Sequence, residues 1–86
     1  MAIVTFRYWA AAKDAAGTAE EKIAARTLAE ALATASDSGR RGAKFDAVLA
    51  RSALLIDGHP VGARAPESVL LTDAAVIEVL PPFAGG

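Results

Sequence analysis

The chain has 86 residues, with 9 Lys and Arg against 10 Asp and Glu, which gives a net charge of −1. This length suits one compact domain and excludes a second, and the balanced charge excludes the basic surface that nucleic-acid binding requires. Apolar residues make up 53% of the chain, but 22 of them are alanine, so 24 larger apolar side chains remain to build a core.

The chain contains no cysteine, which excludes disulfides, thiolate catalysis and cysteine metal ligands. Its N-terminal apolar segment is interrupted by Thr5 and Arg7 and lacks the continuous apolar region of a signal peptide. No other apolar run approaches the roughly 18 residues of a membrane span. We expect a cytoplasmic protein that binds neither membranes nor nucleic acid.

The first third of the chain predicts two strands joined by a short helix. Residues 3–9 are rich in β-branched and aromatic side chains and alternate apolar with polar positions, as a half-buried strand does. Residues 10–16 favour a helical turn, which Gly17 and Thr18 end. Residues 19–26 suit a helix by composition, but their polar side chains also fit the solvent-exposed face of a strand. We predict a strand for this segment.

Thr27 and Glu30 form a capping-box pattern, in which the hydroxyl and the carboxylate satisfy each other's exposed backbone amides. A helix is therefore predicted to begin directly after Thr27, with a buried face at spacings of three and four residues, and to end at Gly39. The following basic residues are interpreted as a solvated loop rather than a partner contact: Arg40, Arg41 and Lys44.

The second half predicts a short helix and three further strands. Residues 44–50 place apolar side chains three and four positions apart, as a helix does, and residues 53–56 form an apolar run typical of a buried strand. Asp57-Gly58-His59-Pro60 has turn chemistry and leads to a short returning strand that includes Val61. Residues 62–67 are predicted as a loop, residues 68–71 as a brief strand or turn, and residues 76–80 as a strand.

The main elements follow the order strand, strand, helix, strand, strand. The most economical way to connect them is a small mixed sheet packed on one main helix. We therefore predict an α+β domain of the β-grasp type over residues 1–80.

Side chains that commonly carry catalysis are sparse and scattered. His59 is the only histidine and lies in a predicted turn, so we expect it to be exposed and to have no partners for a metal site. Glu20 and Glu21 are neighbours whose side chains diverge on a strand or on a helix. The sequence has no nucleophile elbow and no phosphate-binding glycine loop. We predict no enzyme, no metal and no bound cofactor.

Residues 81–86 (PPFAGG) are the most informative segment. Two prolines directly after a strand block further ladder pairing and hold the chain extended, so this segment is predicted to project from the domain as a tail. Phe83 is a large apolar group that fits a pocket on another molecule. The predicted partner-binding residues are Pro81, Pro82, Phe83, Ala84 and Gly85.

Gly85 and Gly86 have no side chains, so the terminal carboxylate can enter a channel too narrow for any other residue. A Gly-Gly end arises by chance in about one chain in 200. A frayed terminus also has no need for stiffening prolines or for an apolar side chain. Gly86 is therefore the predicted reactive residue.

Several of these segments together resemble a known protein family. They are PPFAGG at residues 81–86, Leu71-Thr72-Asp73 with the strand at residues 76–80, and Tyr8-Trp9-Ala10 with Lys13-Asp14 and Gly17. In this combination the chain is similar to the MoaD/ThiS ubiquitin-like sulfur carriers. The double proline favours the branch that contains the small subunit of molybdopterin synthase.

The resemblance implies that Gly86 donates sulfur. An E1-like adenylyltransferase would consume ATP to convert the Gly86 carboxylate into an acyl-adenylate, and a persulfide-bearing sulfur donor protein would displace AMP and leave a thiocarboxylate. The large subunit of molybdopterin synthase, in a heterotetramer of two small and two large subunits, would use this sulfur to convert cyclic pyranopterin monophosphate into molybdopterin. Docking would use Phe83 and apolar groups of the adjoining sheet, for which Phe6 and Leu80 are candidates if they do not belong to the core.

Two positions depart from the family pattern. Asp73-Ala74-Ala75 stands where the family commonly has Asp-Gly-Asp, so a turn that needs positive φ at Ala74 carries a strain of about 1 kcal/mol. Phe83 replaces a smaller aliphatic residue. Three other functions stay open: a sulfur carrier for thiazole or cysteine synthesis, a ubiquitin-like modifier joined to lysines through Gly86, and a β-grasp interaction module with an incidental tail.

Overall fold

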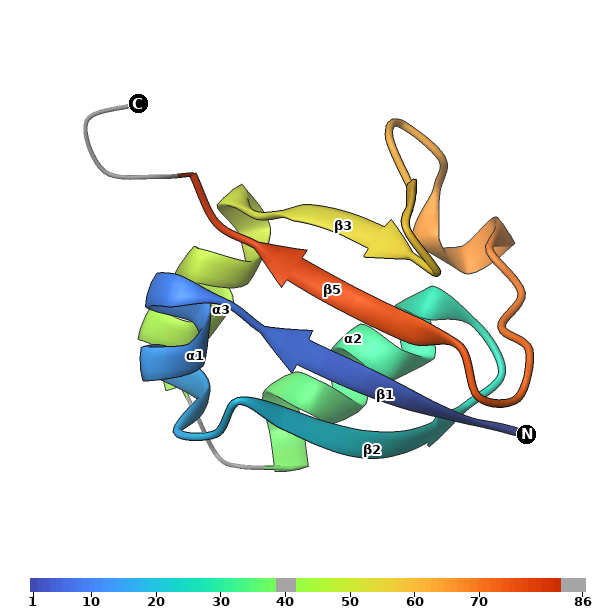
Figure 1. Ribbon diagram of the computed structural model, residues 1–86, viewed down its shortest axis with the longest axis horizontal. Coiled ribbons are helices and arrows are strands. Elements are labelled where there is room, and N and C mark those ends of the chain that lie inside the picture. The colour runs from blue at the N-terminus through green and yellow to red at the C-terminus, as the bar shows by residue number, and fades with distance from the viewer. Residues whose placement is uncertain (39–41, 83–86) are drawn as a thin grey trace.

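The computed structural model describes residues 1–38 and 42–82 of the chain. In these residues a mixed five-stranded sheet in the order β2-β1-β5-β3-β4 packs on helices that lie behind it in Figure 1. This is the predicted α+β, ubiquitin-like β-grasp architecture. The strands are β1 (Ala2–Tyr8), β2 (Glu20–Ala25), β3 (Ala53–Ile56), β4 (His59–Pro60) and β5 (Val76–Leu80), and the helices are α1 (Ala10–Ala16), α2 (Leu28–Ser38), α3 (Gly42–Arg51) and the 3-10 helix η1 (Pro66–Ser68).

The sheet is organised around the parallel pairing of its first and last strands. β1 pairs with β5 from Thr5↔Val76 to Tyr8↔Val79, and β2 and β3 add antiparallel on either side. A parallel pair needs a long crossover connection, because the chain must return to the same end of the sheet. Here the crossover includes α2 and α3, which cover one face of the sheet and leave the other open (Figure 1).

The core lies between the sheet and the helices and takes alternate residues of each strand. Phe6 of β1 and Ile77 of β5 are fully buried, in one cluster with Leu28 of α2 and Phe45 of α3. The Tyr8 ring meets the Phe45 ring edge-on, with centroids 5.8 Å apart, and so links the sheet to α3. Phe6, a docking candidate by sequence, has 0% of its surface exposed and belongs to the core.

β2 confirms the strand predicted for the ambiguous segment. Ile23 and Ala25 are buried, whereas Lys22 and Ala24 are exposed, which is the alternation of a half-buried strand. Pairing with β1 uses the backbone groups of this segment. Tertiary pairing therefore outweighs the helix propensity of its alanine, glutamate and lysine residues.

The start of α2 differs in one detail from the predicted capping box. Thr27 Oγ1 accepts a hydrogen bond from the Glu30 N–H (3.2 Å), as predicted, but Glu30 Oε1 accepts from the Arg26 N–H (2.9 Å) instead of that of Thr27. A bridge between Thr27 and Leu70 fixes the direction in which the chain enters the helix. The sequence predicts a brief strand or turn at residues 68–71. The structure has the end of η1 and this isolated bridge there.

α3 begins earlier than predicted. It starts at Gly42 rather than at residue 44, so Lys44 is an exposed helical residue and not part of a loop. Gly42 has φ 74°, a left-handed conformation that glycine adopts without strain and that lets the chain turn into the helix. The predicted cap and the rest of the basic loop lie outside the described residues: Gly39, Arg40 and Arg41.

β3 and β4 form the predicted tight hairpin. Asp57 (φ 50°) and Gly58 (φ 83°) both adopt left-handed conformations, as the two central residues of a type I′ turn do. Asp57 Oδ1 also accepts a hydrogen bond from the Val76 N–H (2.9 Å), which ties the turn to the start of β5. The returning strand differs from the prediction, because β4 consists of His59 and Pro60, which were assigned to the turn, whereas Val61 lies just after the strand and is buried.

The turn before β5 holds Ala74 at φ 68°, so the positive-φ geometry, for which the sequence analysis expects strain, is the one that this turn adopts. Asp73 Oδ1 accepts a hydrogen bond from the Ile3 N–H (2.8 Å), and the Ala74 N–H donates to the Ile3 carbonyl (2.9 Å). These two bonds join the turn to β1 and keep Ala74 from relaxing to a negative φ.

We expect Ala74→Gly to raise the free energy of unfolding by about 0.5–1 kcal/mol, because glycine adopts positive φ without the clash of a Cβ. Ala47→Gly is the matched control, since Ala47 is exposed inside α3, where the same change costs about 1 kcal/mol of helix stability. Urea unfolding measures both values. Equal destabilisation by the two substitutions would contradict strain at Ala74.

Candidate functional site

The candidate site lies where β5 ends at Leu80, in the middle of the sheet. Pro81 and Pro82 have no backbone N–H, so neither can donate a further ladder hydrogen bond. Pro81 is buried and Pro82 is exposed, so the domain still covers the chain at Pro81. The other predicted tail residues lie outside the described residues, and their roles stay predictions: Phe83, Ala84, Gly85 and Gly86.

The sheet face away from the helices carries a row of side chains near this point. In register, Arg7 of β1 lies between Glu20 of β2 and Glu78 of β5, and Leu55 of β3 lies on the other side of Glu78. Leu80 pairs with Ala53 of β3, one step closer to the tail. We call this surface the open face and define it as Arg7, Trp9, Glu20, Ala53, Leu55, Glu78 and Leu80.

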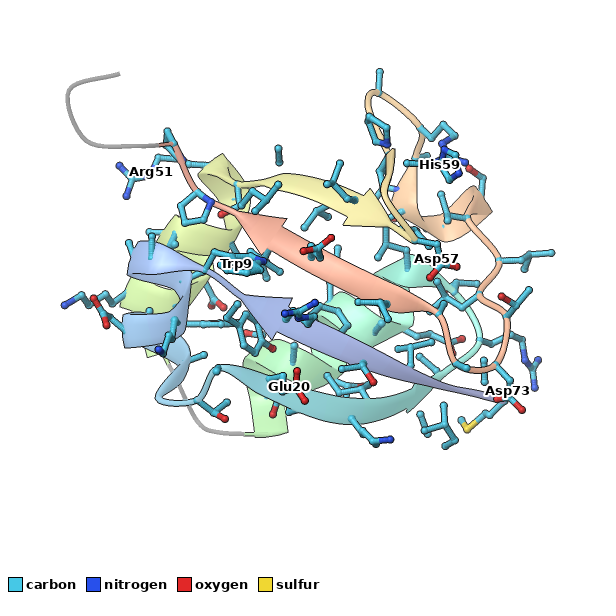
Figure 2. All side chains as sticks on the ribbon, in the orientation of Figure 1. Trp9, Glu20, Arg51, Asp57, His59 and Asp73 are labelled. Carbon is cyan, nitrogen blue, oxygen red and sulfur yellow. The ribbon has the colours of Figure 1, made fainter. Side chains whose placement is uncertain are left out.

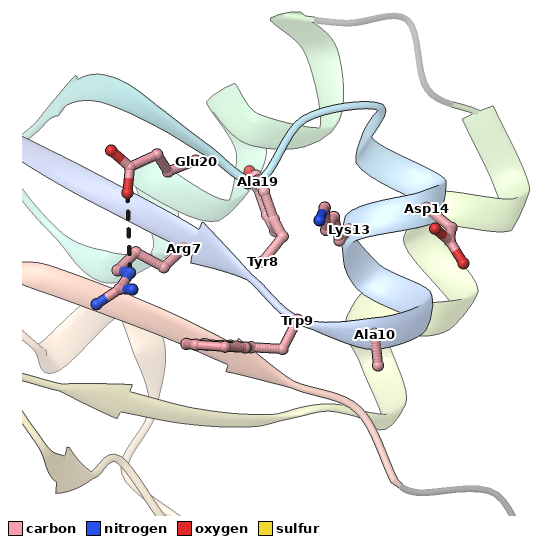
Figure 3. A pocket seen from close by; sticks show the side chains of 8 residues that line it. All are labelled: Arg7, Tyr8, Trp9, Ala10, Lys13, Asp14, Ala19 and Glu20. Carbon is pink, nitrogen blue, oxygen red and sulfur yellow. Dashed lines mark ion pairs between the residues drawn. The ribbon is translucent and has the colours of Figure 1, made fainter.

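Trp9 lies at the tail end of the open face, between β1 and α1. Its N–H donates to the Val79 carbonyl (3.3 Å), and its indole Nε1 donates to Glu78 Oε2 (3.2 Å). The Arg7 guanidinium lies 5.3 Å from the indole ring centre, and Arg7 Nε lies 3.8 Å from Glu20 Oε2 (Figure 3). The indole is therefore held by a cation and a carboxylate while 41% of the Trp9 surface stays exposed.

These contacts orient side chains more than they stabilise the fold. The side chains of Arg7 and Glu20 are 46% and 61% exposed, and ion pairs with such exposure contribute about 0–1 kcal/mol. An exposed cation–π contact adds about 0.5–1 kcal/mol. Their main effect is to present an aromatic ring of fixed orientation beside the point where the tail begins.

A hollow of about 420 Å³ lies on the α1 side of Trp9 (Figure 3). Its charged lining consists of two cations, Arg7 and Lys13, and two carboxylates, Asp14 and Glu20. Because these charges balance, the hollow selects neither anions nor cations. Its lining comes from β1, α1 and the start of β2 and includes no residue of β5, so the hollow lies on the side of Trp9 away from the strand that leads into residues 81–86.

The other residues weighed from the sequence are dispersed. Glu20 lies on the open face, whereas Glu21 Oε2 accepts a hydrogen bond from the buried Tyr8 hydroxyl, so the two carboxylates diverge as predicted. His59 is exposed, as predicted, at the far end of the molecule from Trp9 (Figure 2). Within residues 1–38 and 42–82, no three His, Asp or Glu side chains could hold a metal ion, and no helix is long and apolar enough to cross a membrane.

The sequence analysis missed the roles of Trp9 and Glu78. Their contact joins residues that are 69 positions apart and depends on the parallel register of β1 and β5, which no local pattern encodes. The available signals were a single tryptophan directly after a strand and one glutamate among the apolar residues of β5. Leu80, the second docking candidate besides Phe6, is half-buried and does lie on the open face.

Solved structures with this fold match almost the whole chain. Small archaeal modifier protein 1 (SAMP1) from Methanosarcina acetivorans superimposes with a TM-score of 0.82 and 24% identity, over 100% of this chain and 98% of that chain. A putative molybdopterin converting factor subunit 1 from Pyrococcus furiosus has a TM-score of 0.73 and 23% identity, over 96% and 100%.

A third similar structure is a complex of two proteins. A chain of the protein–protein complex of subunits 1 and 2 of molybdopterin-converting factor from Helicobacter pylori has a TM-score of 0.69 and 24% identity, over 98% of this chain and 99% of that chain. No protein-family model and no curated protein matches the sequence. These similarities establish the ubiquitin-like β-grasp fold.

We expect Arg7→Ala to increase acrylamide quenching of Trp9 fluorescence, because the guanidinium that lies over the indole is removed. Trp9 is the only tryptophan, so the signal reports this ring alone. The free energy of unfolding should fall by no more than about 2 kcal/mol, the upper limit for the ion pair and the cation–π contact together. Lys22→Ala removes the same charge from an exposed position of β2 and is the control. Equal quenching in both variants would show that Arg7 does not shield the ring.

Proposed function

We propose that the chain is a sulfur carrier that acts as the small subunit of molybdopterin synthase. The proposal rests on how the domain connects to its C-terminal segment. The central strand β5 of a β-grasp domain leads directly into residues 81–86, and this segment ends in Gly85-Gly86. In this role the chain is a non-catalytic cosubstrate. Its reactive group is the Gly86 carboxylate, and another protein supplies the catalytic side chains.

The chemistry begins with activation of the Gly86 carboxylate. A carboxylate resists nucleophiles because it is negatively charged and has a poor leaving group, and adenylation with ATP corrects both faults while pyrophosphate is released. A persulfide on a donor protein then attacks the acyl carbon and AMP leaves. When a thiol cleaves the sulfur–sulfur bond, the thiocarboxylate remains on Gly86. ATP is consumed by the E1-like activating enzyme and is not a cofactor of this chain.

The contribution of the carrier itself is positioning. Once the domain is docked, the tethered thiocarboxylate reacts at a high effective concentration with the bound pterin. Gly85 and Gly86 allow the end of the tail to follow a narrow channel, since no Cβ obstructs it. Two deliveries of sulfur to cyclic pyranopterin monophosphate build the dithiolene of molybdopterin.

The proposed partner is the large subunit of molybdopterin synthase, in a heterotetramer of two small and two large subunits. The fold similarity to a chain of the complex of subunits 1 and 2 of molybdopterin-converting factor from Helicobacter pylori supports this choice. The open face supports it as well, because an exposed aromatic residue and half-buried leucines beside the tail are typical of a docking surface.

The second candidate function is that of a ubiquitin-like modifier joined to lysines through Gly86. The similarity to small archaeal modifier protein 1 from Methanosarcina acetivorans, with a TM-score of 0.82, favours it. Both functions begin with the same activation of Gly86, so they differ in the acceptor. Denaturing gels of the native cell extract separate them, since only a modifier forms covalent adducts that survive denaturation and contain this chain.

We expect deletion of Gly86 to abolish sulfur transfer and to leave the fold intact, because a terminal glycine has no side chain to contribute to the core. Intact mass of the native protein should show one oxygen replaced by sulfur in the wild type and no such species in the deletion variant. Gly86→Ala is the matched control: it keeps a terminal carboxylate but adds a methyl group, and it should be sulfurated and delivered poorly. Full transfer by the deletion variant would refute the role of Gly86.

We expect Phe83→Ala to weaken binding to the large subunit by roughly 1–3 kcal/mol, the usual loss for a buried aromatic contact residue. Isothermal titration calorimetry with the purified large subunit measures this difference. Phe83→Leu keeps most of the apolar contact and should lose less. An unchanged Kd for Phe83→Ala would remove Phe83 from the interface.

A further inference from the structure

Glu78 is a carboxylate set among apolar residues of the open face. It lies on β5 between Val76 and Leu80, and Leu55 is its partner in register on β3. Leu55 and Leu80 are both half-buried, so their exposed parts border the carboxylate. A protein that covers these two leucines must also cover Glu78.

The Glu78 carboxylate is oriented but incompletely bonded. Its Oε2 accepts one hydrogen bond, from Trp9 Nε1 at 3.2 Å. An ionised carboxylate can accept about four. Within residues 1–38 and 42–82, Glu78 takes part in no ion pair, and Arg7, its partner in register on β1, is paired with Glu20.

Arg7 is the register partner of Glu78 on β1, but its guanidinium contacts other groups. Its Nε lies 3.8 Å from Glu20, and its guanidinium lies 5.3 Å from the Trp9 ring centre. Glu78 therefore meets an incoming protein as a carboxylate fixed by Trp9, with capacity for further donors. Burial of such a carboxylate without a partner is costly, and a cation with hydrogen-bond donors removes most of that cost.

We propose that Glu78 receives an arginine or lysine of the large subunit, set in an otherwise apolar surface that covers Leu55 and Leu80. This inference rests on the proposed function, because it assumes that the protein that takes up the tail also covers the open face. An arginine fits the site well, since its planar fork can donate to the carboxylate while its stem lies on the leucines. A protein without a cation at this position is rejected, because it leaves Glu78 buried and unpaired.

The test compares binding of the wild-type chain and two variants to the purified large subunit by isothermal titration calorimetry. Glu78→Gln has nearly the same shape and still accepts the hydrogen bond from Trp9, but carries no charge. Glu67→Gln makes the same change at an exposed site in η1 and is the matched control. We expect Glu78→Gln to raise the Kd about tenfold, which corresponds to 1.4 kcal/mol, and Glu67→Gln to leave it unchanged.

The sign of the effect decides between the possible partner surfaces. If the partner surface is purely apolar, removal of the charge makes docking easier, so an equal or lower Kd for Glu78→Gln would overturn the inference and leave the proposed function standing. If the wild-type chain does not bind the large subunit, the proposed function fails and the inference fails with it. Thermal unfolding of both variants confirms that the fold is retained.

Charge reversal and salt provide a second, independent readout. Glu78→Lys should weaken binding more than Glu78→Gln, because it sets two cations against each other. The difference between wild type and Glu78→Gln should shrink as the salt concentration rises, because salt screens the ionic part of the contact. A difference that does not change with salt, together with equal binding of the Lys and Gln variants, would show that Glu78 contacts no cation.

Discussion

The parallel pairing of β1 with β5 is the constraint on which the rest of the molecule depends. It puts the last strand in the middle of the sheet, where the chain leaves beside the first strand and not at an edge. It also requires the crossover that carries α2 and α3 to one face. The same pairing therefore buries one face in the core, leaves the other open, and starts the proposed tail beside that open face.

The open face takes its character from this register. Trp9 and Glu78 meet only because the end of β1 lies next to the end of β5, and Arg7 completes the group from the same strand as Trp9. Each contact is weak in energy because it is exposed. Together they fix the direction of an aromatic ring and of a carboxylate before any partner arrives, which lowers the entropy lost when such groups are buried in an interface.

Local patterns predicted most of the fold, and long-range pairing explains the differences. Alternation identified β1 and β5, and the sequence Asp57-Gly58 identified the hairpin, because in each case the residues that decide the structure are close in the chain. The Glu30 carboxylate accepts from Arg26 instead of Thr27 at the point where the chain also bridges to Leu70, a contact that no local pattern encodes. The candidate site shows the same difference. The terminal motif at residues 81–86 could be recognised from the local sequence, whereas the contact of Trp9 with Glu78 depends on the register of the sheet.

Two terminal glycines give a proposed tail little binding specificity of its own. Gly85 and Gly86 present only backbone, so any protein with a narrow channel and suitable chemistry could accept them. In the proposed function, the residues before the glycines must then determine the partner. The candidate partners are a pterin-binding subunit, another sulfur acceptor and a lysine. On the domain, Glu78 is suited to this task, because an unpaired buried carboxylate penalises a wrong partner more strongly than an apolar contact rewards the right one. In the proposed function, recognition is thereby separated from reactivity: the sheet would recognise the partner, and Gly86 would carry the reactive group.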